Sequence, residues 1–174
     1  QAALRITQCA QEPKLAHEVL INGTFNVLEA CVKNNIKKII FASSASVYGD
    51  PSYLPMDENH PFNNKTYYGA GKIANEQMAR AFKEMYGLKY IGLRYFNVYG
   101  PRMDIYVYYT EVMIKWLDKI DKNESPMIFG DGEQAMDFIY VEDIARANII
   151  ALESDVEEGV YNVGTGVMSS LNDL

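Results

Sequence analysis

Two residues with acid–base capacity, Tyr68 and Lys72, stand four positions apart in the run Tyr68-Gly-Ala-Gly-Lys72. In a helix, residues at this spacing share one face. A phenol with a pKa of about 10 is a poor base at neutral pH, but a nearby ammonium favours the phenolate and lowers that pKa. The spacing predicts a proton-transfer pair. A solvent-facing pair without chemistry has the same spacing, so this run alone leaves both readings open.

Serines follow a short apolar run upstream of that pair. Lys38–Ala42 has the composition of a buried strand, and Ser43, Ser44 and Ser46 come directly after it. A hydroxyl in this place can hydrogen-bond both a substrate hydroxyl and the tyrosine, and so relay a proton. Ordinary turn chemistry is the alternative explanation for these serines.

A second apolar run, Tyr90–Arg94, is followed by Tyr95 and Asn97. Ligands bind at the carboxyl ends of the strands in open α/β sheets, so both polar segments stand where the fold puts chemistry. The Asn97 amide comes just after a buried strand and needs hydrogen-bond partners. For Tyr95, packing in the core is the competing role.

The elements that must position these residues alternate between helix and strand, which predicts an α/β fold with a parallel sheet and flanking helices. Residues 49–66 are rich in Pro, Asp and Asn and predict a loop, Gly87 predicts a helix C-cap, and Ser169 or Ser170 could cap a further helix. The predicted helices are 14–33, 67–86, 107–120 and 141–153, and the predicted strands are 38–42, 90–94, 126–129 and 160–163.

Composition excludes several classes of function. The 174 residues carry a formal net charge of −7, which disfavours nonspecific nucleic-acid binding. There is no apolar run of membrane-spanning length and no basic-plus-apolar leader, so we expect a cytoplasmic protein without a membrane partner. The two cysteines, Cys9 and Cys31, predict buried apolar positions and no disulfide framework. His17 and His60 are too scattered to predict a metal site.

Five motifs occur in order: 41–49 (FASSASVYG), 68–72 (YGAGK), 93–101 (LRYFNVYGP), 130–132 (GDG) and 137–143 (DFIYVED). Together they resemble the NAD-dependent epimerase/dehydratase family, the extended short-chain dehydrogenases, and within it the UDP-glucose and UDP-N-acetylglucosamine 4-epimerases. The resemblance implies a partial Rossmann-like sheet. Residues 1–101 would be the C-terminal portion of the NAD-binding domain. Residues 102–174 would be a mixed substrate-binding region with returning Rossmann elements.

The resemblance also implies a role for each matching residue. The sugar would be oxidised transiently at C4 as hydride passes to NAD, and the hydride would return on the opposite face of a UDP-hexose. The implied catalytic residues are Ser44, Tyr68 and Lys72; the implied NAD-binding residues are Ala2, Ala3, Leu4, Ser43, Tyr68, Lys72, Tyr95 and Val98; the implied substrate-binding residues are Ser44, Ser46 and Asn97.

The residues after Ser44 bear on the branch of the family. Members that eliminate water or decarboxylate commonly carry an acidic residue there, whereas this chain has Ala45 and Ser46. This favours a 4-epimerase over a dehydratase or decarboxylase. A non-catalytic Rossmann-type binding module is the alternative from another class, and the intact set of Ser44, Tyr68 and Lys72 favours the enzyme.

The chain departs from the family pattern at several positions. It lacks the glycine-rich dinucleotide motif, and Gly130-Asp-Gly132 predicts only a turn. Met136 stands where an arginine often faces the nucleotide phosphates, and Leu20 stands where an asparagine usually meets the cofactor, with Asn22 nearby. We therefore expect this chain alone to bind NAD weakly or not at all. We also expect it to self-associate as a homo-oligomer through an uncovered sheet edge.

Overall fold

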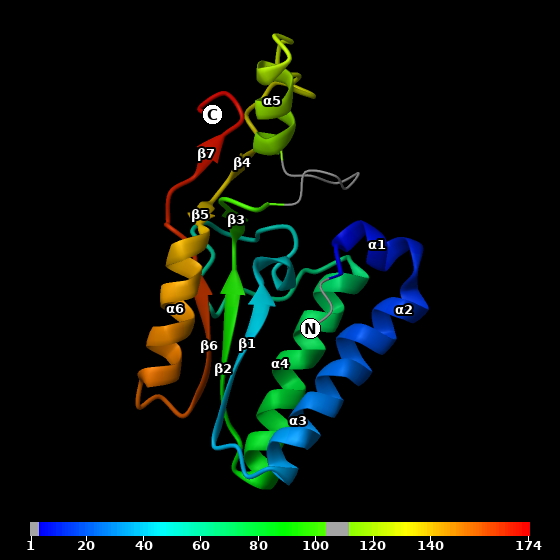
Figure 1. The fold of residues 1–174 in the computed structure, drawn as a ribbon, viewed down its shortest axis with the longest axis vertical. Helices are drawn as coiled ribbons and strands as arrows, with labels where there is room; N and C mark the ends of the chain where they lie inside the picture. Colours follow the sequence, from blue (N-terminus) through cyan, green and yellow to red (C-terminus); the bar gives the residue numbers. More distant parts are fainter. Residues whose placement is uncertain (1–3, 104–111) are drawn as a thin grey trace.

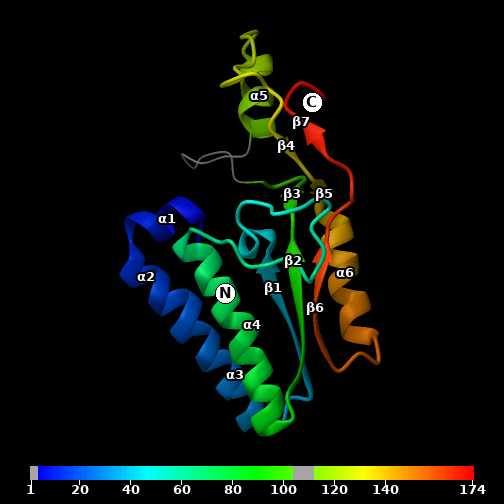
Figure 2. The same ribbon diagram turned by 180° about the vertical axis from the view of Figure 1, so that it is seen from behind.

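A three-stranded parallel sheet forms the centre of the molecule in the computed structural model, which describes residues 4–103 and 112–174. The strand order is β1 (Lys38–Ser44), β2 (Lys89–Tyr95) and β6 (Glu158–Val163). Helices α3 (Gly23–Lys33) and α4 (Tyr67–Tyr86) lie on one side of the sheet, and α6 (Val141–Glu153) lies on the other (Figures 1 and 2). The predicted α/β class with a Rossmann-like parallel sheet is confirmed.

The alternating side chains of β2 divide the core into two layers. Tyr90 points to the side covered by α3 and α4, where Leu28 of α3 and Phe82 of α4 pack around it. Ile91 and Leu93 point to the opposite side, against Ala151 of α6. The strand is therefore apolar on both faces, as expected for a strand covered by helices on both sides.

The carboxyl ends of β1 and β2 coincide in the sheet. Ser43 is in register with Arg94, and Ser44 is in register with Tyr95. The serines and Tyr95, which are distant in sequence, therefore reach the same edge.

The helix predicted over 14–33 is interrupted. It consists of α2 (Pro13–His17), the π-helical turn η1 (Glu18–Asn22) and α3, and an unpredicted helix α1 (Ile6–Gln11) precedes it. Pro13 begins α2 at a position where the missing N–H costs no helical hydrogen bond. The side-chain pattern could not show the π-helical turn, because its five residues are too few for a change of period to be detected.

Helix α4 has the predicted bounds and both ends are capped. The Thr66 hydroxyl accepts a hydrogen bond from the Gly69 amide at 3.0 Å, and Gly87 takes the left-handed conformation, with φ of 72°, at the C-terminus. The preceding segment 49–66 is a loop, as predicted, with one isolated bridge between Gly49 and Asn63.

Shorter elements extend beyond the carboxyl edge of the sheet (Figure 1). Strand β3 (Asn97–Tyr99) pairs in parallel with β5 (Phe138–Tyr140), β4 (Ala135–Met136) pairs antiparallel with β7 (Ser169–Ser170), and α5 (Val112–Asp121) lies beside them. Gly130 and Gly132 both have positive φ in a turn, as predicted. Of the helix predicted over 107–120, residues 107–111 lie outside the described part.

Two predictions in this part of the chain are wrong. Residues 126–129 are not a strand: Phe129 is 78% exposed, and no strand pairs with this segment in the described structure. Ser169 and Ser170 do not cap a helix but form β7 against β4. An apolar run becomes a strand only where a partner strand is available, and this partner choice is not written in the local sequence.

Candidate active site

Ser44 ends β1 and begins the 3-10 turn η2 (Ala45–Val47). Its hydroxyl accepts a hydrogen bond from the Ser46 amide at 3.1 Å and donates to the Ser46 hydroxyl at 3.1 Å. It also lies near enough to Tyr68 that it acts to lower the pKa of that phenol. The serine therefore caps the turn and contacts the tyrosine, so turn chemistry and a proton relay are compatible in this structure.

Tyr68 and Lys72 share one face of α4, as predicted. The Lys72 ammonium lies 5.5 Å from the centroid of the Tyr68 ring and donates to the Ala42 carbonyl oxygen at 2.8 Å. The lysine is thereby bound to the backbone of Ala42, the β1 residue directly before Ser43. The pair faces the end of β1 and not the solvent.

The pKa values in the pair differ from the sequence expectation. Burial raises the pKa of Tyr68, the nearby Ser44 hydroxyl lowers it, and the nearby Cys9 raises it again. Burial likewise lowers the pKa of Lys72, against an opposing effect of Cys9. We expected the ammonium to lower the phenol pKa, but desolvation is the dominant influence in the structure.

Two glycines allow α4 to approach its neighbours closely. A Cβ on Gly69 would lie 2.6 Å from the Ser46 carbonyl oxygen, and a Cβ on Gly71 would lie 2.8 Å from the Leu20 side chain. Real Cβ atoms do not approach other atoms this closely. A larger residue at position 69 would therefore push against the backbone of Ser46, and one at position 71 would force the Leu20 side chain to shift. The run between Tyr68 and Lys72 thus lets α4 lie close to η2 and η1.

Two cavities, of about 420 and 260 Å³, meet at the pair. They share Leu4, Ser44, Tyr68, Phe96 and Val98 as lining residues. Ser46 and Asn97 line the larger one, and Ser43, Lys72 and Tyr95 line the smaller one. Most of the predicted site residues therefore converge on one connected region; Ala2 and Ala3 lie outside the described residues.

Three of the predicted residues also have hydrogen bonds inside the protein. The Ser43 hydroxyl donates to Glu76, and Tyr95 pairs its hydroxyl with the Asn148 amide at 2.7 Å. The Asn97 amide donates to the Asp137 carbonyl oxygen at 3.0 Å. This satisfies the requirement that Asn97 has a partner, and Asn97 still lines the larger cavity.

Sequence reasoning missed a buried ion pair below the site. Arg94 holds both carboxylate oxygens of Glu76, at 2.9 and 2.8 Å, and each side chain is 3% exposed. Burial acts to lower the pKa of Arg94, but the hydrogen bonds to Glu76 and Tyr48 outweigh it and raise the pKa. The one signal in the sequence is that Glu76 repeats the four-residue spacing of Tyr68 and Lys72.

Ser, Tyr and Lys side chains gather at the carboxyl edge of the parallel sheet, which is where open, Rossmann-type α/β folds bind ligands. The family profile described as the NAD dependent epimerase/dehydratase family matches residues 2–164. The chain belongs to that family.

Individual relatives agree with this assignment. The chain is 43% identical, over 99% of its length, to a putative UDP-glucose 4-epimerase of Methanocaldococcus jannaschii. The solved UDP-N-acetylglucosamine 4-epimerase of Methanobrevibacter ruminantium, in complex with UDP-N-acetylmuramic acid, is 42% identical over 98% of the chain and 55% of its own, with a TM-score of 0.94. The UDP-glucose 4-epimerase of Thermotoga maritima, solved with UDP-glucose, is 35% identical over 99% and 56%, with a TM-score of 0.92.

The chain spans about half the length of the curated relatives it matches, 56% in the case of the Methanocaldococcus jannaschii protein. In the described residues, no helix is long and apolar enough to cross a membrane, and no group of His, Cys, Asp and Glu could hold a metal ion.

Proposed function

We propose that the whole protein is an NAD-dependent UDP-hexose 4-epimerase. The observation that carries this proposal is the convergence of the Ser44 hydroxyl, the Tyr68 phenol and the Lys72 ammonium on connected cavities. The names of the relatives point to the same reaction, and those relatives act on or bind UDP-sugars by their descriptions.

The described residues fit the nicotinamide end of NAD. Lys72 and Tyr95 place polar groups in the 260 Å³ cavity, while Leu4, Leu20 and Val98 give it apolar walls. Such a lining suits a flat ring joined to a ribose. When bound, NAD supplies an acceptor that takes hydride from the sugar carbon and returns it. Lys72 is placed to bind ribose hydroxyls, and Leu20 offers packing where the family usually has an amide.

In this reaction, Tyr68 takes the proton of the C4 hydroxyl and later gives it back. Ser44 lies beside Tyr68 and is placed to hydrogen-bond the sugar hydroxyl, so that the proton moves along a short path. Ser46 and Asn97 line the larger cavity, where they are placed to contact the sugar nucleotide. No net oxidation of the sugar results, because the electron pair that leaves C4 returns to it.

The lining of the cavities favours an epimerase over a dehydratase or decarboxylase. Among the described residues, no aspartate or glutamate lines either the 420 or the 260 Å³ cavity. Elimination of water needs a further acid or base near the sugar carbon. Ala45 and Ser46, which follow Ser44, do not supply one.

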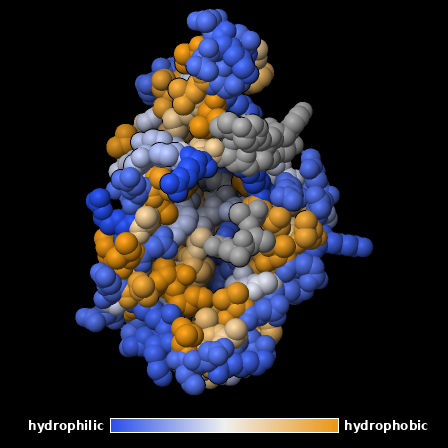
Figure 3. Space-filling view, viewed as in Figure 1, coloured by the Kyte–Doolittle hydropathy of each residue, from blue (hydrophilic) through white to orange (hydrophobic). Residues whose placement is uncertain are grey.

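We also propose that this chain by itself binds NAD weakly and self-associates. Within the described residues, β2 is the one strand paired with β1, and a cavity of about 780 Å³ lies beside β1. Its lining includes Val19, Val27 and Phe41, and Figure 3 shows hydrophobic residues gathered on this face of the molecule. An unpaired edge next to apolar surface favours association. We propose a cytoplasmic location.

The test uses the whole protein and a panel of UDP-sugars. We expect interconversion of UDP-glucose with UDP-galactose, or of the N-acetyl sugars, followed by NMR of the products without added reductant. A 4-keto-6-deoxy product would identify a dehydratase and contradict the proposal. Binding of UDP-sugars without any turnover would identify the non-catalytic binding module instead.

A further inference from the structure

Glu76 and Arg94 form the most deeply buried ion pair in the described residues, and Glu76 lies on the same helix as Tyr68 and Lys72. The guanidinium binds the carboxylate through both oxygens, and each side chain is 3% exposed. Burying two charges brings a large desolvation penalty, and packed apolar residues of similar size often give equal stability. The need for a stable core therefore does not by itself explain these residue types.

The remaining hydrogen bonds of the pair lead toward the site. The Ser43 hydroxyl donates to Glu76 at 2.5 Å, and Ser43 is the residue directly before Ser44. Arg94 donates to the Tyr48 hydroxyl at 2.8 Å and to the Glu58 carbonyl oxygen at 3.2 Å. The pair thus joins α4, β1, β2 and the loop that follows η2.

Three side chains of helix α4 meet the last three residues of β1. Tyr68 contacts Ser44, Lys72 contacts the Ala42 carbonyl oxygen, and Glu76 contacts Ser43. These helix residues are spaced by four, so they form one row, with a rise of about 6 Å between neighbours. Glu76 therefore stands about 12 Å along the helix from Tyr68 and touches no reacting atom.

We propose that Glu76 and Arg94 are positioning residues: their ion pair fixes the placement of α4 on the sheet and thereby the alignment of Tyr68 with Ser44. This inference rests on the proposed epimerase function. A displacement of about 1 Å at a reacting group can lower a rate by about a hundredfold. The loss would appear in kcat, because the residues that contact the sugar nucleotide are unchanged.

The decisive variant is the double substitution Glu76→Met with Arg94→Met in the whole protein with NAD bound. It removes both charges together and leaves neither unpaired. We expect a melting temperature close to that of the wild type and a kcat lower by about tenfold to a hundredfold. KM for the UDP-sugar should stay within roughly threefold of the wild-type value. The pH profile of kcat should shift to higher pH, because a misaligned Ser44 no longer lowers the pKa of Tyr68.

A folded double variant with the kcat and pH profile of the wild type would overturn the inference. Should this variant not fold, Ser43→Ala removes the hydrogen bond between β1 and Glu76. Because Ser43 also lines the 260 Å³ cavity, the affinity of this variant for NAD is measured beside kcat, and it should equal that of the wild type. We expect Ser43→Ala to lower kcat severalfold at unchanged KM, and Ser43→Thr to restore it; an unchanged kcat in Ser43→Ala overturns the inference. Wild-type protein that turns over no UDP-sugar contradicts the proposed function, and with it this inference. An active wild type with unaffected variants contradicts the inference alone.

Discussion

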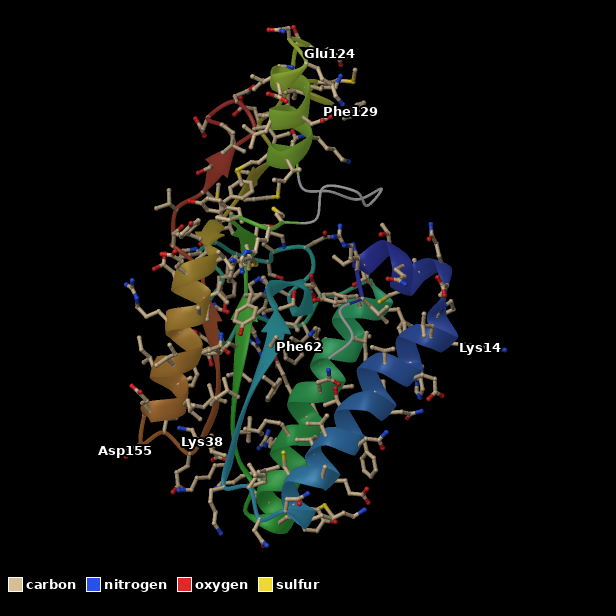
Figure 4. All side chains as sticks on the ribbon, in the orientation of Figure 1. Lys14, Lys38, Phe62, Glu124, Phe129 and Asp155 are labelled. Carbon is tan, nitrogen blue, oxygen red and sulfur yellow. The ribbon has the colours of Figure 1, made fainter. Side chains whose placement is uncertain are left out.

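Two regions of this molecule differ in how deeply their ion-paired side chains are buried. In the corner of the candidate site, formed by the ends of β1 and β2 with α4, the Arg94 and Glu76 side chains are each 3% exposed. In the distal end, formed by residues 112–134 and 167–174, the Lys122–Asp118 pair is 59% and 62% exposed. Figure 4 shows Glu124 and Phe129 projecting at that end. The same kind of interaction thus has very different surroundings in one chain.

The difference teaches what each region can do. Buried, doubly hydrogen-bonded groups cannot move independently, so the corner can keep reacting groups in a fixed geometry. Exposed ion pairs of the distal end contribute between about 0 and 1 kcal/mol, so they hold nothing in place. Inside this end, the indole N–H of Trp116 donates to the Met127 carbonyl oxygen at 3.1 Å. A region held this way can change sequence without moving the corner.

The largest expected effect in the corner is on the reaction. Tyr68→Phe removes one hydroxyl and retains the ring that packs beside Cys9 and Leu20. Loss of a general acid–base group lowers kcat by about 10²- to 10⁴-fold. Steady-state rates with a UDP-hexose, together with circular dichroism to confirm the fold, test this. Turnover near the wild-type level would remove Tyr68 from the mechanism.

The next effect is on stability. Glu76→Gln leaves the buried Arg94 with its charge unpaired, and breaking a buried pair in this way costs about 3–5 kcal/mol. Asp118→Asn at the exposed pair of the distal end is the matched control, with an expected change of about 0–1 kcal/mol. Urea denaturation of the whole protein measures both. Equal effects at the two sites would erase the contrast between the regions.

The sequence predicts those features of the candidate site that depend on the spacing of neighbouring residues. Tyr68 and Lys72 share a face because four residues make about one helical turn, and Ser44 ends β1 because strand and turn are adjacent in the chain. The Glu76–Arg94 pair could not be predicted, since it joins residues on different elements, 18 positions apart. The direction of the Ser43 hydroxyl, toward Glu76 across 33 positions, depends on the same packing.

The distal end was harder to predict for a related reason. The apolar run 126–129 has strand composition, but no strand pairs with it in the described residues, and its side chains are largely exposed. Ser169 and Ser170 have the composition of a helix cap, but Ala135 and Met136 take them as strand partners. Partner choice between distant segments is a tertiary property, and periodicity within either segment does not contain it.

A smaller effect concerns pH. If the phenolate of Tyr68 is the base, the rate rises with pH until this phenol is ionised, and burial places that pKa above its ordinary value. The Ser44 hydroxyl lowers the pKa, so its removal must raise it further. We expect the rising limb of the kcat profile to move to higher pH in Ser44→Ala and to stay in place in Ser44→Thr. A shift to lower pH in Ser44→Ala would contradict this assignment.

The smallest effect is expected at the distal end. Phe129 is 78% exposed, so Phe129→Ala removes little buried surface and should change the free energy of unfolding by less than about 0.5 kcal/mol. Phe82 of α4 is 8% exposed and packs with Leu28 and Tyr90, so Phe82→Ala should cost about 3–5 kcal/mol. Both variants carry the same Phe→Ala substitution, so urea denaturation of the two compares the effect of burial alone on the free energy of unfolding. A large loss of unfolding free energy in Phe129→Ala would mean that another part of the whole protein packs on the distal end. The kcat of this variant would then show whether the same contact affects the candidate site.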